Sequence, residues 1–244
     1  MELKHELSTL SLLKLISFLF WSGLYLQWAV DTEHSPEYCS RVVTLLHGLV
    51  ASCVGLAQCG LKTFSPSSLT LPLTWSQYAL MMWSWGYFAF DLMWCLIYWT
   101  KNAVMLIHHF SALAAINLYI SKQNTGCIFA CTIALLEITN PLLQTRWFLR
   151  NAGHNNTILF YVVEFTYLVM FVSLRGLFGT YLVYRIIKSE TFGVYEKLIT
   201  LALYLVSLIF IYEIVGYVLY KYRNKIEEFR GFGNELVFIL QEQQ

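Results

Sequence analysis

The chain has 244 residues, of which 57% are hydrophobic and only 13% are charged, with a formal net charge of +1. A soluble globular domain carries about 25% charged residues, so too few polar side chains remain to cover a soluble surface, and the composition predicts a multi-pass membrane protein. The small net charge, without a basic patch interleaved with aromatic residues, argues against nucleic acid as a partner.

Long apolar runs follow one another along the chain. A helix needs about 20 apolar residues to cross the hydrocarbon core of a bilayer, and about seven runs approach that length. They cover residues 10–30, 42–61, 75–99, 103–121, 126–149, 158–187 and 198–220. The sixth run is long enough to tilt or break near Arg175. We therefore predict an all-α fold, a transmembrane bundle of about seven helices.

Short polar segments separate the runs. Residues 62–74 contain Pro66 and Pro72 and are typical of a loop. Residues 100–102 form a very tight turn, so the third and fourth runs should make an antiparallel hairpin. Residues 151–157 form another polar turn, and the charged tail that starts at Lys221 is expected to be a solvated arm.

The six cysteines give no sign of a metal site or a redox motif. Most lie inside apolar runs, without a CxxC pair or zinc spacing, so we expect small buried packing residues. The adjacent His108 and His109 lack the partner motifs of membrane di-iron enzymes. The sequence thus predicts no metal and no resident cofactor.

Lysine and arginine favour the cytosolic side of a membrane. With a cytosolic C-terminus, that side holds Arg41, Lys101, Arg146, Arg150, Lys221, Arg223, Lys225 and Arg230, and the other holds Lys4, Lys62, Lys122, Lys188 and Lys197. The larger set favours a cytosolic tail and a lumenal N-terminus. In this orientation the glycosylation sequon at Asn155 faces the cytosol and stays unmodified.

Polar side chains inside the apolar runs lie at one depth. They are His47, Asp91, His108, His109, Glu137, Asn140, Glu164 and Glu213. At about 1.5 Å per residue they are roughly 9–15 Å from the cytosolic helix ends. Such groups are costly in lipid, so we predict a shared, partly hydrated cavity open to the cytosol. The alternative is that they are interhelical hydrogen-bonding groups. Arg175 lies deeper, with no role assigned beyond a helix break or an acid partner.

The histidine pair is the centre of this layer. His108 and His109 point about 100° apart around a helix, so one can face the cavity while the other contacts a neighbouring helix. Asp91 lies across the predicted turn, where a carboxylate could orient an imidazole as a general base, although the same pair could be a structural bond. The catalytic candidates are His108, His109, Asp91 and Glu137, and the substrate-binding candidates are His47, Asn140, Glu164 and Glu213.

Four segments resemble the TLC-domain family, which includes the ceramide synthases and the TRAM translocation proteins. They are RVVTLLHGLVASC from Arg41, GYFAFDLMWC from Gly86, MLIHHF from Met105 and EITNPLLQTRWFLR from Glu137. The resemblance implies an N-terminal segment with one helix over residues 1–37, a TLC domain of six helices in a barrel over 38–223, and a tail over 224–244.

The resemblance also implies chemistry and location. Ceramide synthases join a fatty acyl-CoA to a sphingoid amine, and their histidine pair matches His108 and His109. Their pair of aspartates would fall near Glu137 and Asn140, so one carboxylate is kept and one is replaced by an amide. The expected partners are membrane lipids, with acyl-CoA as candidate co-substrate and a lipid amine as acceptor, in the endoplasmic reticulum. A non-enzymatic lipid carrier or cargo-handling factor is the alternative.

Overall fold

The computed structural model describes residues 2–31, 33–59, 72–98, 103–122 and 126–242, and within them it is all-helical, without a strand. Its elements are α1 (Glu2–Asp31), α2 (Pro36–Cys59), α3 (Trp75–Ile97), α4 (Ala103–Ile120), α5 (Gly126–Glu137), α6 (Asn140–Asn151), α7 (Ile158–Phe171), the π-helix η3 (Val172–Phe178), α8 (Gly179–Lys188) and α9 (Val194–Glu242). In the described chain, 7 helical segments are long and apolar enough to cross a membrane. The predicted fold class is confirmed.

Two predicted runs are not continuous α-helices. The fifth run divides into α5 and α6 at Ile138 and Thr139, where Pro141 stands in the first turn of α6 and cannot continue a helix from the preceding turn. The sixth run is α-helix, then π-helix, then α-helix, with Arg175 inside the π-helical segment. The irregularity expected near Arg175 is therefore present as a widened helical turn.

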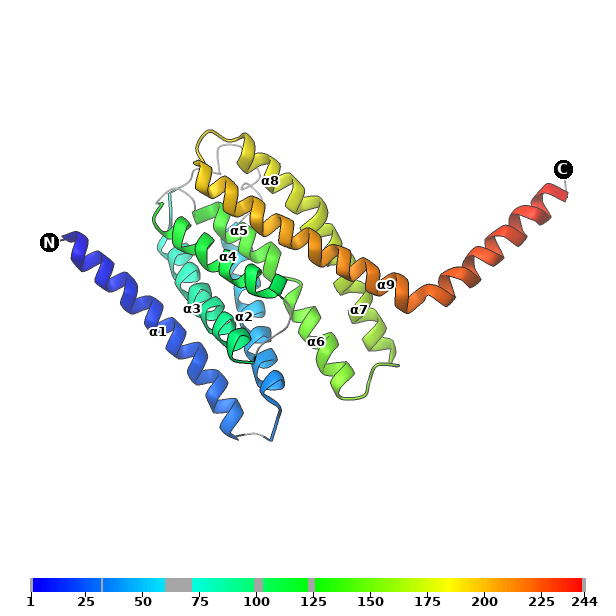
Figure 1. The fold of residues 1–244 in the computed structure, drawn as a ribbon, viewed down its shortest axis with the longest axis horizontal. Coiled ribbons are helices and arrows are strands. Elements are labelled where there is room, and N and C mark those ends of the chain that lie inside the picture. The colour runs from blue at the N-terminus through cyan, green and yellow to red at the C-terminus, as the bar shows by residue number, and fades with distance from the viewer. Residues whose placement is uncertain (1, 32, 60–71, 99–102, 123–125, 243–244) are drawn as a thin grey trace.

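The helix α2 packs against α5, α6 and α3, while α1 lies along the outside of α3 (Figure 1). Small residues allow the close approach of α2 to α5 and α6. A Cβ atom on Gly55 would lie 2.9 Å from the Ala134 side chain, and one on Gly48 would lie 3.1 Å from Asn140 Cβ. Such small-residue contacts are typical of membrane helix packing, and here they set the spacing at the site.

The expectation for the cysteines is wrong for one pair. Cys59, at the end of α2, forms a disulfide with Cys131 in α5. The two residues are 72 positions apart, so sequence spacing gave no sign that α2 and α5 are neighbours. Cys39 and Cys95 are buried, as expected, and Cys53 is exposed.

The connections agree with expectation where the structure describes them. The turn before α7 contains Gly153 in the left-handed region, with φ of 79°, and Thr157 caps α7 by accepting from the Phe160 N–H. Residues 100–102 and most of the proline-containing loop lie outside the described residues. The predicted arm from Lys221 is helical, because α9 continues as helix to Glu242 and extends away from the bundle (Figure 1). After Val194 no proline interrupts it.

Candidate functional site

A polar cavity of about 780 Å³ opens between the first turns of α2, the last turns of α3 and the first turns of α4 and α6. We call it the polar chamber. Among the sequence-predicted site residues it is lined by Asp91, His108, His109, Glu137, Asn140 and Glu213. Helices far apart in the sequence therefore bring most of the predicted layer to one space.

A carboxylate–imidazole pair lies in this chamber. His109 Nε2 is 3.0 Å from Asp91 Oδ2, and both residues are buried. The Tyr87 hydroxyl donates to the same Asp91 oxygen at 3.4 Å and contacts Thr44 Oγ1 at 3.2 Å. A carboxylate can only accept, so it favours the proton on Nε2 and leaves Nδ1 as the basic nitrogen. Within the described residues, His109 Nδ1 is buried without a hydrogen-bond partner.

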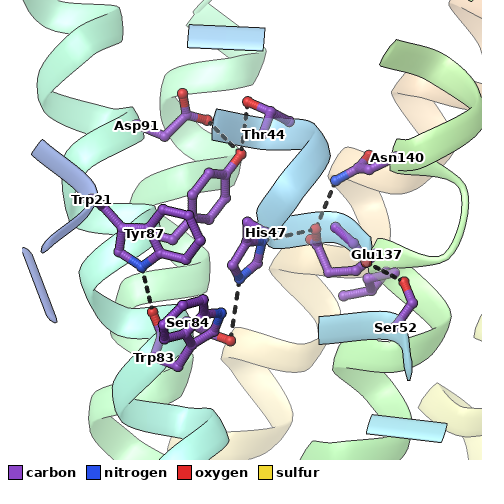
Figure 2. A network of polar contacts seen from close by, with 12 residues as sticks. Trp21, Thr44, His47, Ser52, Trp83, Ser84, Tyr87, Asp91, Glu137 and Asn140 are labelled. Atoms are coloured by element: carbon purple, nitrogen blue, oxygen red, sulfur yellow. Dashed lines mark hydrogen bonds and ion pairs between the residues drawn. The ribbon is translucent and has the colours of Figure 1, made fainter. Parts of the chain in front are cut away.

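A second buried network lies beside this pair (Figure 2). His47 is fully buried, with Nδ1 3.3 Å from Glu137 Oε2 and Nε2 3.3 Å from Ser84 Oγ. The Asn140 amide donates to the same Glu137 oxygen at 2.8 Å. The His47 ring stacks on Tyr87 at 3.8 Å between centroids, which joins the two networks through one aromatic pair. His47 does not line the polar chamber. It therefore orients Glu137 from the side that faces away from the chamber.

A narrower apolar cavity of about 110 Å³ adjoins the chamber. Its walls come from α4, α5, η3, α8 and α9 and include Ala112, Ala115, Ile116, Phe129 and Ile186. We call it the apolar cavity. Roughly 10–15 Å³ on this measure holds one water, so the cavity is large enough for part of a hydrocarbon chain. Its lining runs along α4 from His108 to Tyr119, away from the polar chamber.

The two spaces meet at four side chains. Phe88, His108, Glu137 and Arg175 line both cavities. His108 Nδ1 and Arg175 Nε are buried there without a hydrogen-bond partner among the described residues. Sequence reasoning left Arg175 outside the layer. Its only signal was a charge in the middle of the sixth apolar run.

Glu164 lies apart from this site. Its carboxylate accepts from Arg146 Nε at 2.8 Å, Tyr217 Oη at 3.0 Å and Tyr222 Oη at 2.6 Å, and it is also paired with Lys221. It is only 1% exposed and lines neither cavity. The structure therefore does not bring Glu164 to the predicted substrate site. Its carboxylate is bonded instead to cations and hydroxyl groups of α6 and α9.

One group of side chains has the donor types of a metal site. Asp91, Cys95 and His109 each offer a ligand atom, and these atoms lie within 4.8 Å of one another. Carboxylate, thiolate and imidazole are zinc ligands. The same carboxylate and imidazole already contact each other directly, so their arrangement is accounted for without a metal ion.

Comparisons with known proteins agree with this architecture. A family model described as the TLC domain matches residues 37–223. A curated relative, TLC domain-containing protein 4 A of Dictyostelium discoideum, is 25% identical over 151 residues. That match covers 58% of this chain and 56% of the relative, so the chain spans little more than half the length of the relative it matches.

Proposed function

Because this chain belongs to the TLC-domain family, we propose that it binds a membrane lipid with a hydrocarbon chain in the apolar cavity and the lipid's polar end in the polar chamber. The observation that carries the proposal is the junction of the two spaces at His108, Glu137 and Arg175. An apolar space that shares part of its lining with a polar one matches a molecule with one apolar and one polar end.

The chemistry proposed for the chamber is acyl transfer. His109, oriented through Asp91, acts as the base through Nδ1. It takes a proton from an acceptor amine while the nitrogen of that amine attacks the carbonyl carbon of a fatty acyl thioester. A C–N bond forms, the C–S bond breaks, and the proton passes from the imidazole to the departing thiolate. A positioned base of this kind contributes about 10²–10⁴-fold to a rate. In this reaction one amine and one acyl thioester give one amide and one thiol, as in ceramide-synthase-type N-acyl transfer to a lipid amine.

We place the chamber on the cytosolic side, in the membrane of the endoplasmic reticulum. Two features support this orientation. The first turns of α2, with Arg41, line the chamber, and the sequence places the larger set of lysines and arginines on this side. The disulfide lies at the opposite end of α2, and disulfides persist in oxidising compartments such as the lumen. The acyl-CoA of the proposed reaction would then reach the chamber from the cytosol.

The first test is the lipid that accompanies the protein. Full-length protein purified in mild detergent is extracted and its lipids are identified by mass spectrometry. We expect acyl-chain lipids at near-stoichiometric amounts. Recovery of only the detergent and bulk lipids in their membrane proportions would contradict the proposal.

The second test separates enzyme from carrier. The purified protein is incubated with radiolabelled acyl-CoA and a panel of lipid amines, beside the variants His108→Ala and His109→Ala. His154→Ala is the matched control, because His154 is exposed in the turn before α7. We expect an amide product that His109→Ala abolishes and His154→Ala leaves unchanged. Lipid binding without product from any acceptor would support the non-enzymatic carrier instead.

A further inference from the structure

Arg175 is a buried cation that the proposed chemistry does not use. The residue is 5% exposed and lies in the middle of the π-helix Val172–Phe178. Within the described residues, no carboxylate oxygen lies within ion-pair distance of its guanidinium. The Glu137 carboxylate acts on this charge only at longer range, without a contact. A buried charge without a directly contacting counter-ion is costly. Short π-helical insertions in helices also occur frequently at functional sites.

The contacts of Arg175 account for part of its donor capacity. Its Nη2 donates to the Leu136 carbonyl at 2.8 Å, one of the carbonyls left open where α5 ends. Its guanidinium lies 4.6 Å from the centroid of the Phe171 ring. A guanidinium has five N–H donors, and Nε is buried with no partner in the described part of the chain. Donors therefore remain for a ligand.

The position of Arg175 defines which ligand those donors can reach. The side chain lines both the apolar cavity and the polar chamber. The nearby Glu137 is already bonded to Asn140 and paired with His47, so its oxygens are engaged by those neighbours. A ligand group at this point is therefore attached to a hydrocarbon chain on one side. On the other side it faces a cation that has no direct ion pair within the described residues.

We propose that Arg175 binds the carboxylate of a single-chain fatty acid whose hydrocarbon part occupies the apolar cavity. Arginine matches a carboxylate geometrically, with parallel N–H donors. The small volume of the apolar cavity, about 110 Å³, favours one chain over two. The inference rests on the proposed function for the location of the chain, and it adds the chemical class of the ligand and the residue that selects it.

The test compares two ligands that differ only in charge. Binding of a long-chain fatty acid and of its methyl ester is measured on delipidated full-length protein in detergent, by displacement of a fluorescent fatty-acid probe. Wild-type protein should prefer the acid. Arg175→Gln should lower acid affinity by about tenfold to a hundredfold, the effect of losing hydrogen bonds to a charged group, and leave ester affinity nearly unchanged. Arg185→Gln is the matched control, because Arg185 lies ten residues further along and contacts Tyr181 outside both cavities.

Each outcome has one meaning. Equal binding of acid and ester by the wild type overturns the inference and leaves the proposed function standing, whereas no binding of either ligand overturns the proposed function itself. If Arg175 only caps α5, Arg175→Gln weakens both ligands equally, and this result also overturns the inference. If Arg175→Gln does not fold, Arg175→Lys keeps the charge but loses the parallel donors, and it should show a reduced acid preference.

Discussion

Two buried carboxylates in this protein have opposite surroundings. Glu164 is contacted by Arg146, Lys221 and two tyrosine hydroxyls, and it lines neither cavity. Asp91 contacts His109 and Tyr87 and faces the polar chamber. Around Glu164 the bonding is complete, while around Asp91 the neighbouring imidazoles keep nitrogens without partners among the described residues.

This difference separates a structural cluster from a candidate site. Membrane helices can be joined by polar contacts, and a carboxylate that is fully bonded has no capacity left for a ligand. A binding site instead needs polar atoms that lack a hydrogen-bond partner until a ligand binds. The Glu164 cluster joins α6, α7 and α9, so we assign it to stability, while the Asp91 group remains the candidate for ligand chemistry.

Asp91→Asn should give the largest effect and should act on turnover alone. An amide can donate to Nε2 of His109, which places the ring proton on Nδ1 and removes the base. We expect acyl transfer to fall by about 10²–10⁴-fold, with a thermal midpoint in detergent close to the wild-type value. Transfer rates and melting curves on the same preparation measure both. Unchanged transfer would show that the Asp91–His109 contact is structural, like that of Glu164.

Glu164→Gln should show the opposite pattern. It leaves Arg146 and Lys221 without their anion, and loss of one partner in a buried ion pair is strongly destabilising. Because Lys221 is partly exposed, we expect roughly 3 kcal/mol, the lower end of the usual range. The thermal midpoint should fall by several degrees while the bound lipid stays the same.

The matched control for Glu164→Gln is Glu37→Gln. Glu37 pairs with Arg41 at 2.9 Å, but its side chain is 53% exposed. Exposed pairs contribute about 0–1 kcal/mol, so its melting curve should hardly move. A larger shift for Glu37→Gln than for Glu164→Gln would reverse the assignment of the Glu164 cluster.

Tyr222→Phe should give the smallest effect. It removes one hydroxyl donor, at 2.6 Å from Glu164, and leaves both cations in place. A hydrogen bond to a charged group contributes about 1.5–3 kcal/mol, and Tyr222 is only half-buried. The loss of stability should therefore be at the lower end, about half of that for Glu164→Gln. Thermal melts of both single variants and of the double variant measure this. If the stability losses of the two single variants add up fully in the double variant, Tyr222 stabilises the protein independently of Glu164.

The fold class could be predicted from the sequence, because the length of an apolar run alone indicates a membrane-spanning helix. Most of the residues of the candidate site could be found for a similar reason, because a polar residue in an apolar run is conspicuous. The helical rise per residue then converts its position in the run into a depth in the membrane. Depth does not give direction around the helix, so Glu164 was grouped with the chamber although its partners come from α6 and α9. Arg175 was left out because a one-dimensional depth cannot show that two cavities meet beside it.

The disulfide between Cys59 and Cys131 has a mechanical consequence. It fastens the last residue of α2 to the middle of α5, while the first turns of α2 line the polar chamber. From this fixed point the two helices can separate only toward the opposite end of α2. Any widening between these helices that admits a lipid must therefore be greatest at the mouth of the chamber and vanish at the fastened end.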